Sequence, residues 1–221
     1  MTETGNGSVI VAGAGPGVSG SLARLFGSEG RSLGLLGVDE EALTDLAMEL
    51  REAGAHVQAR IVDLTDDAAA RAAVTSLGEA LGPIDVVHFN PSAFREKDPL
   101  HLTPDELAHD VALGVGSLLT VVQAALPFMH PGSRVTVTGS MAADKPWNRA
   151  ASLGVQKAGL RNLVKSLDDT LAEHGIRAVT LTVNGTLAKE GTFSPDQVAA
   201  AIRAAVDQPE ADWQAEVPYG D

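Results

Sequence analysis

A glycine-rich loop between an apolar run and an amphipathic pattern, all within residues 8–26, constrains this chain more than any other feature. Three consecutive β-branched residues at 9–11 predict a buried parallel strand, and the apolar spacing after the loop predicts a helix. Gly13, Gly15 and Gly17 have no side chains to keep a ligand from the backbone, and the helix would present free N–H groups and a positive dipole end. Strand, glycine turn and helix in this order predict a site for the pyrophosphate of a dinucleotide.

Apolar runs and helical patterns alternate along the rest of the chain, after a polar N-terminal tail at 1–7 that we expect to be flexible. Besides the strand and helix of the glycine segment, strands are expected at 31–36, 56–62, 84–89, 134–138, 177–183 and 213–217. Helices are expected at 40–53, 66–81, 103–129, 150–174 and 195–206. This alternation predicts a single α/β domain over 8–221, a Rossmann-type, doubly wound parallel sheet of about seven strands with helices on both faces. Cofactor and chemistry would lie at the carboxyl ends of the strands.

Composition narrows the possible partners and the compartment. The 221 residues carry a formal net charge of −13, which would repel nucleic-acid backbones and anionic membranes, so neither is expected as a partner. The chain has no cysteine, and its six histidines form no metal-binding motif, so no metal site is expected. No N-terminal apolar stretch is long enough for a signal peptide or a spanning helix, which favours a cytoplasmic location.

Four short motifs, in matching order and spacing, resemble those of the short-chain dehydrogenase/reductase family over nearly the whole chain. They are Gly13-x-x-x-Gly17-x-Ser19, with serine for the family's last glycine, Asp63-Leu64-Thr65, Asn90 after the fourth expected strand, and Val183-Asn184-Gly185. The resemblance implies an NAD(H) or NADP(H) cofactor and a small-molecule substrate. The cofactor-binding residues would be Gly13, Gly15, Gly17, Val18, Asp39, Asp63, Leu64, Asn90, Lys157, Gly185 and Leu187.

The family's catalytic set carries over only in part. Ser140 matches the catalytic serine, and Lys157 matches the lysine of the family's Y-x-x-x-K motif. The tyrosine position, counted from either residue, falls on Leu153, and the position of the family's relay asparagine falls on Gly114. The chain therefore resembles an atypical branch without the tyrosine, whose phenol would protonate the nascent alkoxide. Tyr219, in the C-terminal tail, is no obvious replacement.

Several residues have two possible roles at this stage. Ser140 could instead satisfy backbone groups at a strand end, and Lys157 could be a solvated cation. Trp147 could be a substrate platform or a covered edge. Asp39 could bind the ribose of the cofactor, but it more readily caps the helix expected at 40–53. Acidic residues at 39–41 would repel a 2′-phosphate, which slightly favours NAD(H) over NADP(H).

The sequence therefore favours a divergent NAD(P)-binding oxidoreductase that acts on a carbonyl or alcohol with an incomplete catalytic set. The alternative is a non-redox protein on the same fold, either a ligand-binding sensor, a partner module or a non-redox enzyme. A scaffold without a ligand is a third possibility. The short connection at 184–194 leaves no room for a substrate lid, so an open site is expected. Apolar spacing in the helices at 103–129 and 150–174 predicts exposed stripes that pair copies of the chain into a homodimer or homotetramer. In the second helix the stripe would consist of Leu160, Leu163, Val164 and Leu167.

Overall fold

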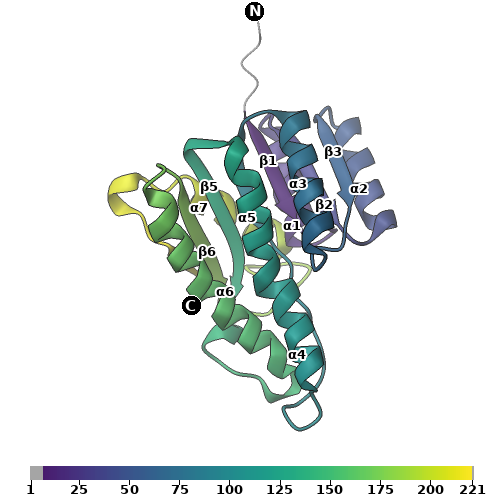
Figure 1. The fold of residues 1–221 in the computed structure, drawn as a ribbon, viewed down its shortest axis with the longest axis vertical. Helices are drawn as coiled ribbons and strands as arrows, with labels where there is room; N and C mark the ends of the chain where they lie inside the picture. Colours follow the sequence, from purple (N-terminus) through teal and green to yellow (C-terminus); the bar gives the residue numbers. More distant parts are fainter. Residues whose placement is uncertain (1–6, 221) are drawn as a thin grey trace, which may run out of the picture.

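The computed structural model describes residues 7–220, which form one seven-stranded sheet (Figure 1). The strands are β1 (Ser8–Ala12), β2 (Ser32–Gly37), β3 (Val57–Ile61), β4 (Ile84–Phe89), β5 (Met129–Ser140), β6 (Arg177–Val183) and β7 (Glu216–Tyr219). Their order is β3-β2-β1-β4-β5-β6-β7, and every neighbouring pair is parallel. The predicted doubly wound α/β fold is confirmed. The tail expected to be flexible lies, except for Gly7, outside the described residues.

Helices cover both faces of this sheet, and Figure 1 shows α5 and α6 in front of it and α7 behind it. The helices are α1 (Val18–Ser28), α2 (Glu40–Glu52), α3 (Asp67–Leu81), α4 (Pro104–Val111), α5 (Ser117–Ala125), α6 (Ala151–Ala172) and α7 (Pro195–Val206). Apolar side chains of α3, α5 and α6 pack with Val87 and Val137 of the sheet in one core. Those of α1, α2 and α7 pack with Val11 and Val86 in a second core on the opposite face. Both faces of the strands are thus buried, as the continuous apolar runs indicate.

The strand order reverses at β1, which pairs with β2 on one side and with β4 on the other. After β1 the chain continues toward one edge of the sheet, and after β4 it continues toward the other edge. The loops that follow these two strands therefore diverge and leave a crevice between them. Ligands of open parallel sheets bind in the crevice at such a point. The glycine loop follows β1 and segment 90–103 follows β4, so both border this crevice.

The helix expected at 103–129 is divided in the structure. α4 is followed by a π-helical turn at Ala112–Gly116, then by α5 and by a 3-10 turn at Leu126–Phe128. Strand β5 then begins at Met129 rather than at 134, because Met129 pairs with Ile84 across an irregularity in the register. The expected helix is therefore interrupted by a π-helical turn. It ends before Met129, where strand β5 begins earlier than expected.

The last strand also differs from the expectation, since it covers Glu216–Tyr219 rather than 213–217. The guanidinium groups of Arg134 and Arg177 both lie over the indole ring of Trp213, each 5.0 Å from its centroid. The aromatic side chain therefore stacks with two cations instead of entering the sheet.

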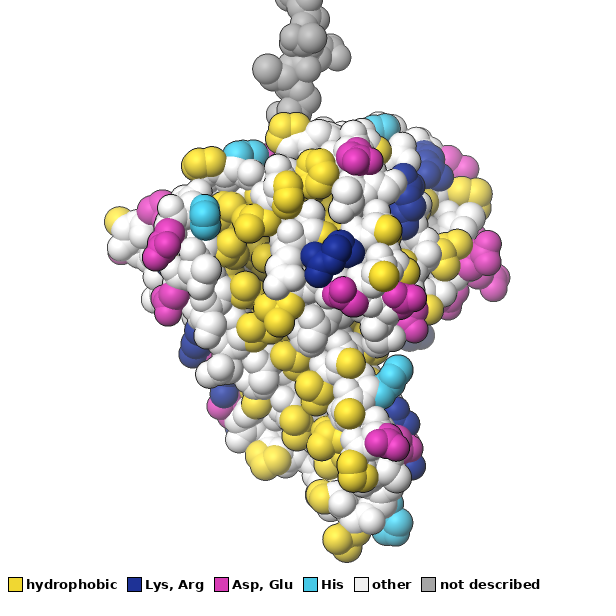
Figure 2. Space-filling model, in the orientation of Figure 1, with side chains coloured by type: hydrophobic (Ala, Val, Ile, Leu, Met, Phe, Trp, Pro, Cys, Tyr) yellow, Lys and Arg dark blue, Asp and Glu magenta, His cyan; other side chains and the backbone are white. Residues whose placement is uncertain are grey.

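The helical segment Pro104–Phe128 is long and apolar enough to cross a membrane by length and composition alone. Its inner side belongs to the core, where Leu118 and Val121 are buried, so we interpret it as a core helix. Its outer side includes Leu119, which is exposed. Figure 2 shows apolar side chains gathered in a band over α5 and α6 on this face, continuing toward α4.

Candidate cofactor and catalytic site

The glycine loop connects β1 to α1, and its three glycines are present for different structural reasons. Gly13 has a φ of 76°, and an added Cβ would lie 2.9 Å from the ring of Pro91, so backbone and packing both require glycine there. Gly15 and Gly17 have no positive φ, and an added Cβ on either would meet nothing within 4 Å. The fold therefore leaves open space over these two residues, which is what the close approach of a pyrophosphate to the backbone requires.

The N-terminus of α1 also differs from those of most other helices. Four helices begin with a residue whose side chain accepts a hydrogen bond from a backbone N–H of the first turn. These residues are Asp39 for α2, Asp66 for α3, Thr103 for α4 and Ser194 for α7. α1 begins after Gly17 without a side-chain cap. Within residues 7–220, no side chain therefore satisfies its first N–H groups, which suits an anionic ligand.

Ser19 takes the place of the family's last glycine without loosening the packing of α1. It is buried, and its hydroxyl accepts a hydrogen bond of 3.1 Å from the backbone N–H of Gly15. The closest contact between α1 and the glycine loop is at Gly20, one residue after Ser19, where an added Cβ would overlap the carbonyl oxygen of Gly15. The serine thus still lets the helix pack, and its hydroxyl bonds the loop at Gly15.

A cavity of about 380 Å³ lies at the carboxyl ends of β1, β2 and β3 and is lined in part by Gly13, Asp39, Asp63 and Leu64. The Oδ1 atom of Asp63 accepts hydrogen bonds from the backbone N–H and the hydroxyl of Thr65, at 2.9 and 2.7 Å. These bonds lower the pKa of the Asp63 carboxyl, so it is ionised at neutral pH. Its Oδ2 makes no hydrogen bond within residues 7–220 and can accept one from a ligand.

Asp39 has the capping role that the sequence favoured, because its Oδ1 accepts the backbone N–H of Ala42 at 3.0 Å. The same side chain also lines the 380 Å³ cavity. The two roles are compatible, because one carboxylate accepts several hydrogen bonds.

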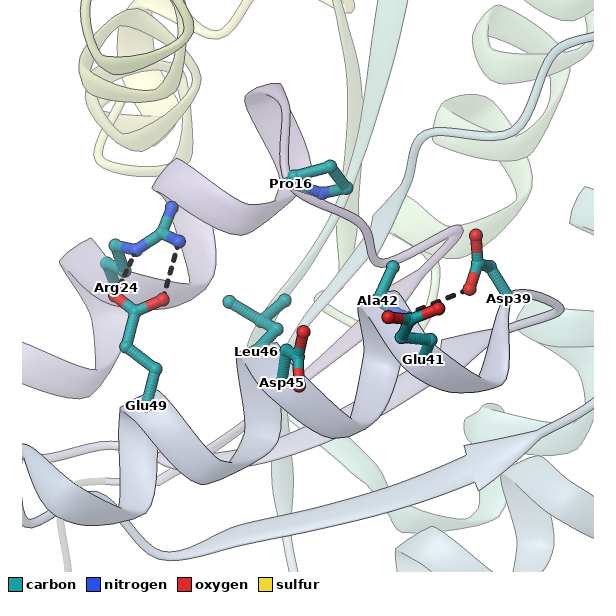
Figure 3. A pocket seen from close by; sticks show the side chains of 8 residues that line it. All are labelled: Pro16, Arg24, Asp39, Glu41, Ala42, Asp45, Leu46 and Glu49. Atoms are coloured by element: carbon teal, nitrogen blue, oxygen red, sulfur yellow. Dashed lines mark hydrogen bonds and ion pairs between the residues drawn. The ribbon is translucent and has the colours of Figure 1, made fainter.

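A hollow of about 350 Å³ continues beyond Asp39 along α2 and is shown in Figure 3. Glu41 and Asp45 border it, and its arginine, Arg24, is held by Glu49 through two bonds of 2.6 and 2.7 Å (Figure 3). Because the arginine is already paired, the remaining carboxylates make the potential here negative. A 2′-phosphate at this end of the crevice would be repelled.

A neighbouring cavity of about 330 Å³ brings most of the other predicted residues together. It is lined by Gly17, Val18, Asn90, Ser92, Phe94, Thr138, Gly139, Ser140, Leu153, Lys157, Val183, Gly185 and Leu187. Ser92 lines both this cavity and the one of 380 Å³, so the two adjoin along one crevice. Of the predicted site residues, Gly15 and Gly114 line neither cavity.

Lys157 reaches the second cavity from α6 with little exposure to solvent. The residue is 5% exposed, and its Nζ donates a hydrogen bond of 2.8 Å to the backbone carbonyl of Thr138. Burial lowers the pKa of the ammonium group to about 8. This burial excludes the interpretation of Lys157 as a solvated cation. Leu153, four residues earlier on the same side of the helix, lines the cavity at the position that the resemblance assigns to a tyrosine.

Ser140 ends β5 and faces the same cavity. Its Oγ accepts the backbone N–H of Ala142 at 3.2 Å, which starts a 3-10 turn. The strand-end role is therefore real, but the hydroxyl proton remains free to be donated to a ligand.

Sequence reasoning missed a buried histidine beside Lys157. His88 of β4 is fully buried, with Nδ1 at 2.9 Å from the hydroxyl of Thr136 and Nε2 at 3.3 Å from that of Thr138. Burial, and to a lesser extent the charge of Lys157, lower the pKa of His88 to about 3, so its ring is neutral. The signal in the sequence was a polar residue within each of two neighbouring apolar strands, which requires a polar partner inside.

Gln156 was also missed, and it explains Gly114. Its side chain is fully buried and bonds both the N–H and the carbonyl of Ala93, at 2.9 and 3.1 Å. A Cβ on Gly114 would overlap the Gln156 amide. The glutamine therefore occupies the space beside the position where the resemblance expects an asparagine, and it ties α6 to the loop after β4.

The connection after β6 is short and fixed, which leaves the crevice open as the sequence indicated. The ring of Phe193 packs so closely on Gly185 and Gly220 that a Cβ on either would overlap it. The Tyr219 hydroxyl donates a hydrogen bond of 2.7 Å to the carbonyl of Thr192, and its ring meets that of Phe193 edge-on. Tyr219 thus holds this loop and does not line the cavity.

Two aromatic side chains lie in contact beside the crevice, one lining its cavity of 330 Å³ and the other lining a separate cavity of about 590 Å³. Phe94 lines the cavity of 330 Å³, and its ring centroid lies 6.1 Å from that of Trp147. Trp147 is 45% exposed, so it is not a covered edge of the core.

These features define a dinucleotide-binding α/β protein, and comparison with known proteins gives the family. The sequence model of the short chain dehydrogenase family matches residues 8–192. The chain therefore belongs to the short-chain dehydrogenase family.

Relatives and solved structures agree with this assignment. The oxidoreductase UcpA of Salmonella typhimurium is 31% identical over 176 residues, covering 77% of this chain and 65% of the relative. The 2,3-dihydro-2,3-dihydroxybenzoate dehydrogenase of Bacillus subtilis is 27% identical over 181 residues, covering 80% and 69%. A metagenomic short-chain oxidoreductase solved in complex with NADP has the same fold, with a TM-score of 0.85, 24% identity and 97% of each chain covered. The chain spans about two thirds of the length of the UcpA proteins it matches.

Proposed function

We propose that this protein is an NAD(P)-dependent oxidoreductase that interconverts a carbonyl group and an alcohol on a small molecule. One observation carries the proposal: a single crevice joins the open glycine loop to Ser140 and Lys157. The family match and the names of the relatives support it. Leu153 at the tyrosine position makes this an atypical member with an incomplete catalytic set.

Each end of the crevice suits one part of a dinucleotide. The glycine loop and the N-terminus of α1 would bind the pyrophosphate, with Asp63 and Leu64 beside the adenine. Asn90 and Lys157 would hold the second ribose, and Gly185 and Leu187 would border the nicotinamide, which supplies or accepts a hydride when bound. The Ser140 hydroxyl would orient the reacting oxygen.

Titration and turnover together test this function. We expect calorimetry to detect binding of at least one of NAD⁺, NADH, NADP⁺ and NADPH, and a panel of aldehydes, ketones and alcohols to show slow turnover by nicotinamide absorbance. Absence of binding of all four at millimolar concentration would contradict the proposal. The matched control is Met48→Glu, an exposed residue on α2 outside the four cavities described above, which should change neither readout.

For the cofactor we propose NAD(H), because Asp39 and the carboxylates beyond it face the end that would hold the first ribose. Asp39→Ser removes the charge but keeps a side chain that can cap α2. We expect the ratio of NAD(H) to NADP(H) affinity to fall at least tenfold, with an unchanged melting temperature. Asp39→Ala should shift the ratio similarly and also lower stability by about 1 kcal/mol through the lost cap. An unchanged ratio in both variants would argue against a role of Asp39 in selection.

A non-redox function on the same fold is the second candidate, and the aliphatic side chain of Leu153 in the cavity favours it. A sensor, a partner module or a non-redox enzyme would bind the dinucleotide or another small ligand in the same crevice. Binding without turnover across the whole panel would support this candidate over an oxidoreductase.

We also propose that the described fold is one domain, works in the cytoplasm and assembles as a homodimer or homotetramer. Leu160 and Val164, predicted for the pairing face, are instead buried in the core against the sheet. The outer sides of α5 and α6, with Leu119 and Val155 exposed, are the surfaces that a second copy would cover. Neither nucleic acid nor a membrane is proposed as a partner, because of the net charge of −13.

A further inference from the structure

We propose that Lys157 itself delivers the proton to the substrate oxygen during carbonyl reduction, the step for which this crevice offers no phenol. This inference rests on the proposed oxidoreductase function. It names the proton donor of that reaction, which the resemblance to the family leaves open.

The composition of the cavity carries the inference. Among the side chains that line it in the described part of the chain, that of Lys157 alone is ionisable. The hydroxyls of Ser92, Thr138 and Ser140 are no more acidic than the alcohol product, so they cannot drive the transfer, although they can align the oxygen. Leu153 has no proton to give.

The position of the ammonium group also fits a donor. Its single hydrogen bond within residues 7–220 goes to the Thr138 carbonyl at 2.8 Å, and no carboxylate is paired with it. An ammonium group has three protons, so one is fixed by the strand while two remain for a ribose hydroxyl and a substrate oxygen. The hydrogen bond to Thr138 also aims the group at the end of β5, where Ser140 faces the cavity.

The acidity of Lys157 is suited to the role. Burial lowers its pKa to about 8, so the group is mostly protonated at neutral pH yet gives up its proton far more readily than an exposed lysine. His88 is the titratable group that the structure places against Lys157, and it is neutral at every pH above about 3. We therefore assign the pH dependence of the reaction near neutrality to the titration of Lys157.

A reduced nicotinamide held beside Gly185 and Leu187 would supply a hydride, with both electrons, to the carbonyl carbon, and the electrons of the carbonyl π bond would move to oxygen. That oxygen takes a proton from Nζ of Lys157, which gives the alcohol and a neutral amine. The amine regains its proton from water, for which the open crevice provides access. In the oxidation direction the same amine accepts the proton of the alcohol.

The pH profile gives the first test. In the reduction direction, kcat should fall by tenfold per pH unit above about 8, because only the ammonium form donates. In the oxidation direction, kcat should rise through the same pH. Turnover with a profile that is flat from pH 6.5 to 9.5 in both directions would overturn the inference and leave the proposed function intact. Cofactor binding without any turnover would overturn both.

Substitution gives the second test and separates a proton donor from a mere anchor of the ribose. Lys157→Met keeps an unbranched side chain only one atom shorter and should lower kcat for reduction by 10²- to 10⁴-fold, with loss of the pH break. An anchor alone would raise KM for the cofactor and leave kcat and the pH break unchanged, which would overturn the inference. Lys165→Met, on an exposed lysine of the same helix, is the matched control and should alter neither parameter.

Rescue by a second donor excludes the explanation that Lys157→Met only damages the fold. In a Leu153→Tyr background the phenol can donate in place of the ammonium, so Lys157→Met should cost at least tenfold less in kcat there than in the parent protein. An equal loss in both backgrounds would count against Lys157 as the donor.

Discussion

At the scale of single residues, this site contains both strongly required glycines and glycines that only a ligand explains. Gly13 is fixed by its positive φ and by Pro91, whereas Gly15 and Gly17 border open space. A side chain at these two positions is tolerated by the folded protein and obstructs only what approaches the loop.

Gly17→Val makes this distinction measurable. The melting temperature should change little, because an added Cβ meets no atom within 4 Å. Dinucleotide binding should fall below detection in calorimetry, because the branched side chain would occupy the space of the phosphates. A variant that binds as tightly as the parent would place the pyrophosphate elsewhere.

Leu153 is the residue from which activity can be gained. Leu153→Tyr would place a phenol four residues before Lys157 on the side of α6 that faces the cavity. We expect kcat for reduction of a generic aldehyde or ketone to rise about 10- to 100-fold, at the low end of general acid catalysis because Gly114 supplies no relay amide. Leu153→Phe, which lacks only the hydroxyl, should show no gain. A gain in both variants would point to packing instead of proton transfer.

At the scale of helices and strands, the features that depend on the local apolar pattern could be predicted from the sequence. The features that depend on contacts between distant segments could not. Residues 9–11 are apolar throughout, and residues 84–89 are apolar except for Asp85 and His88, which suffices to predict buried parallel strands. The π-helical turn at Ala112–Gly116 has no such pattern in the sequence, and the tight contact of its Gly114 with the side chain of Gln156 comes from another helix. Site residues fixed by the glycine motif could be predicted. The burial of His88 had one signal, a polar residue in each of two neighbouring strands, whereas the burial of Gln156 had none.

The contact between Gly114 and Gln156 gives a test at this scale. Gly114→Ala should lower the free energy of unfolding by about 1–3 kcal/mol, because the new methyl group would overlap a glutamine held by three hydrogen bonds. Gly116→Ala, in the same turn, has its nearest contact at 4.0 Å and should not destabilise the protein. In a Gln156→Ala background most of the penalty of Gly114→Ala should disappear in urea unfolding. A penalty that persists there would assign the role of Gly114 to the backbone.

At the scale of the whole molecule, the apolar band over α5 and α6 is the surface on which we expect a second copy of the chain to bind. Leu119 is 37% exposed and Val155 50% exposed on these helices, in a protein whose net charge otherwise favours solvation. We expect light scattering at micromolar concentration to give the mass of a dimer or tetramer. Leu119→Glu with Val155→Glu should give the mass of one chain, about 23 kDa. Met48→Glu, at a similar exposure on α2, should not change the mass. A monomeric parent protein would refute the assembly.

The open space over Gly15 and Gly17 also has a consequence for the lifetime of the protein. Glycine in place of alanine at such positions destabilises the fold by about 0.4–1 kcal/mol each, because it widens the conformational freedom of the unfolded chain. A ligand at one hundred times its dissociation constant restores about 2.7 kcal/mol. The abundance of this protein in a cell should therefore follow the supply of its dinucleotide, since the ligand-free chain is the form that unfolds and is degraded first.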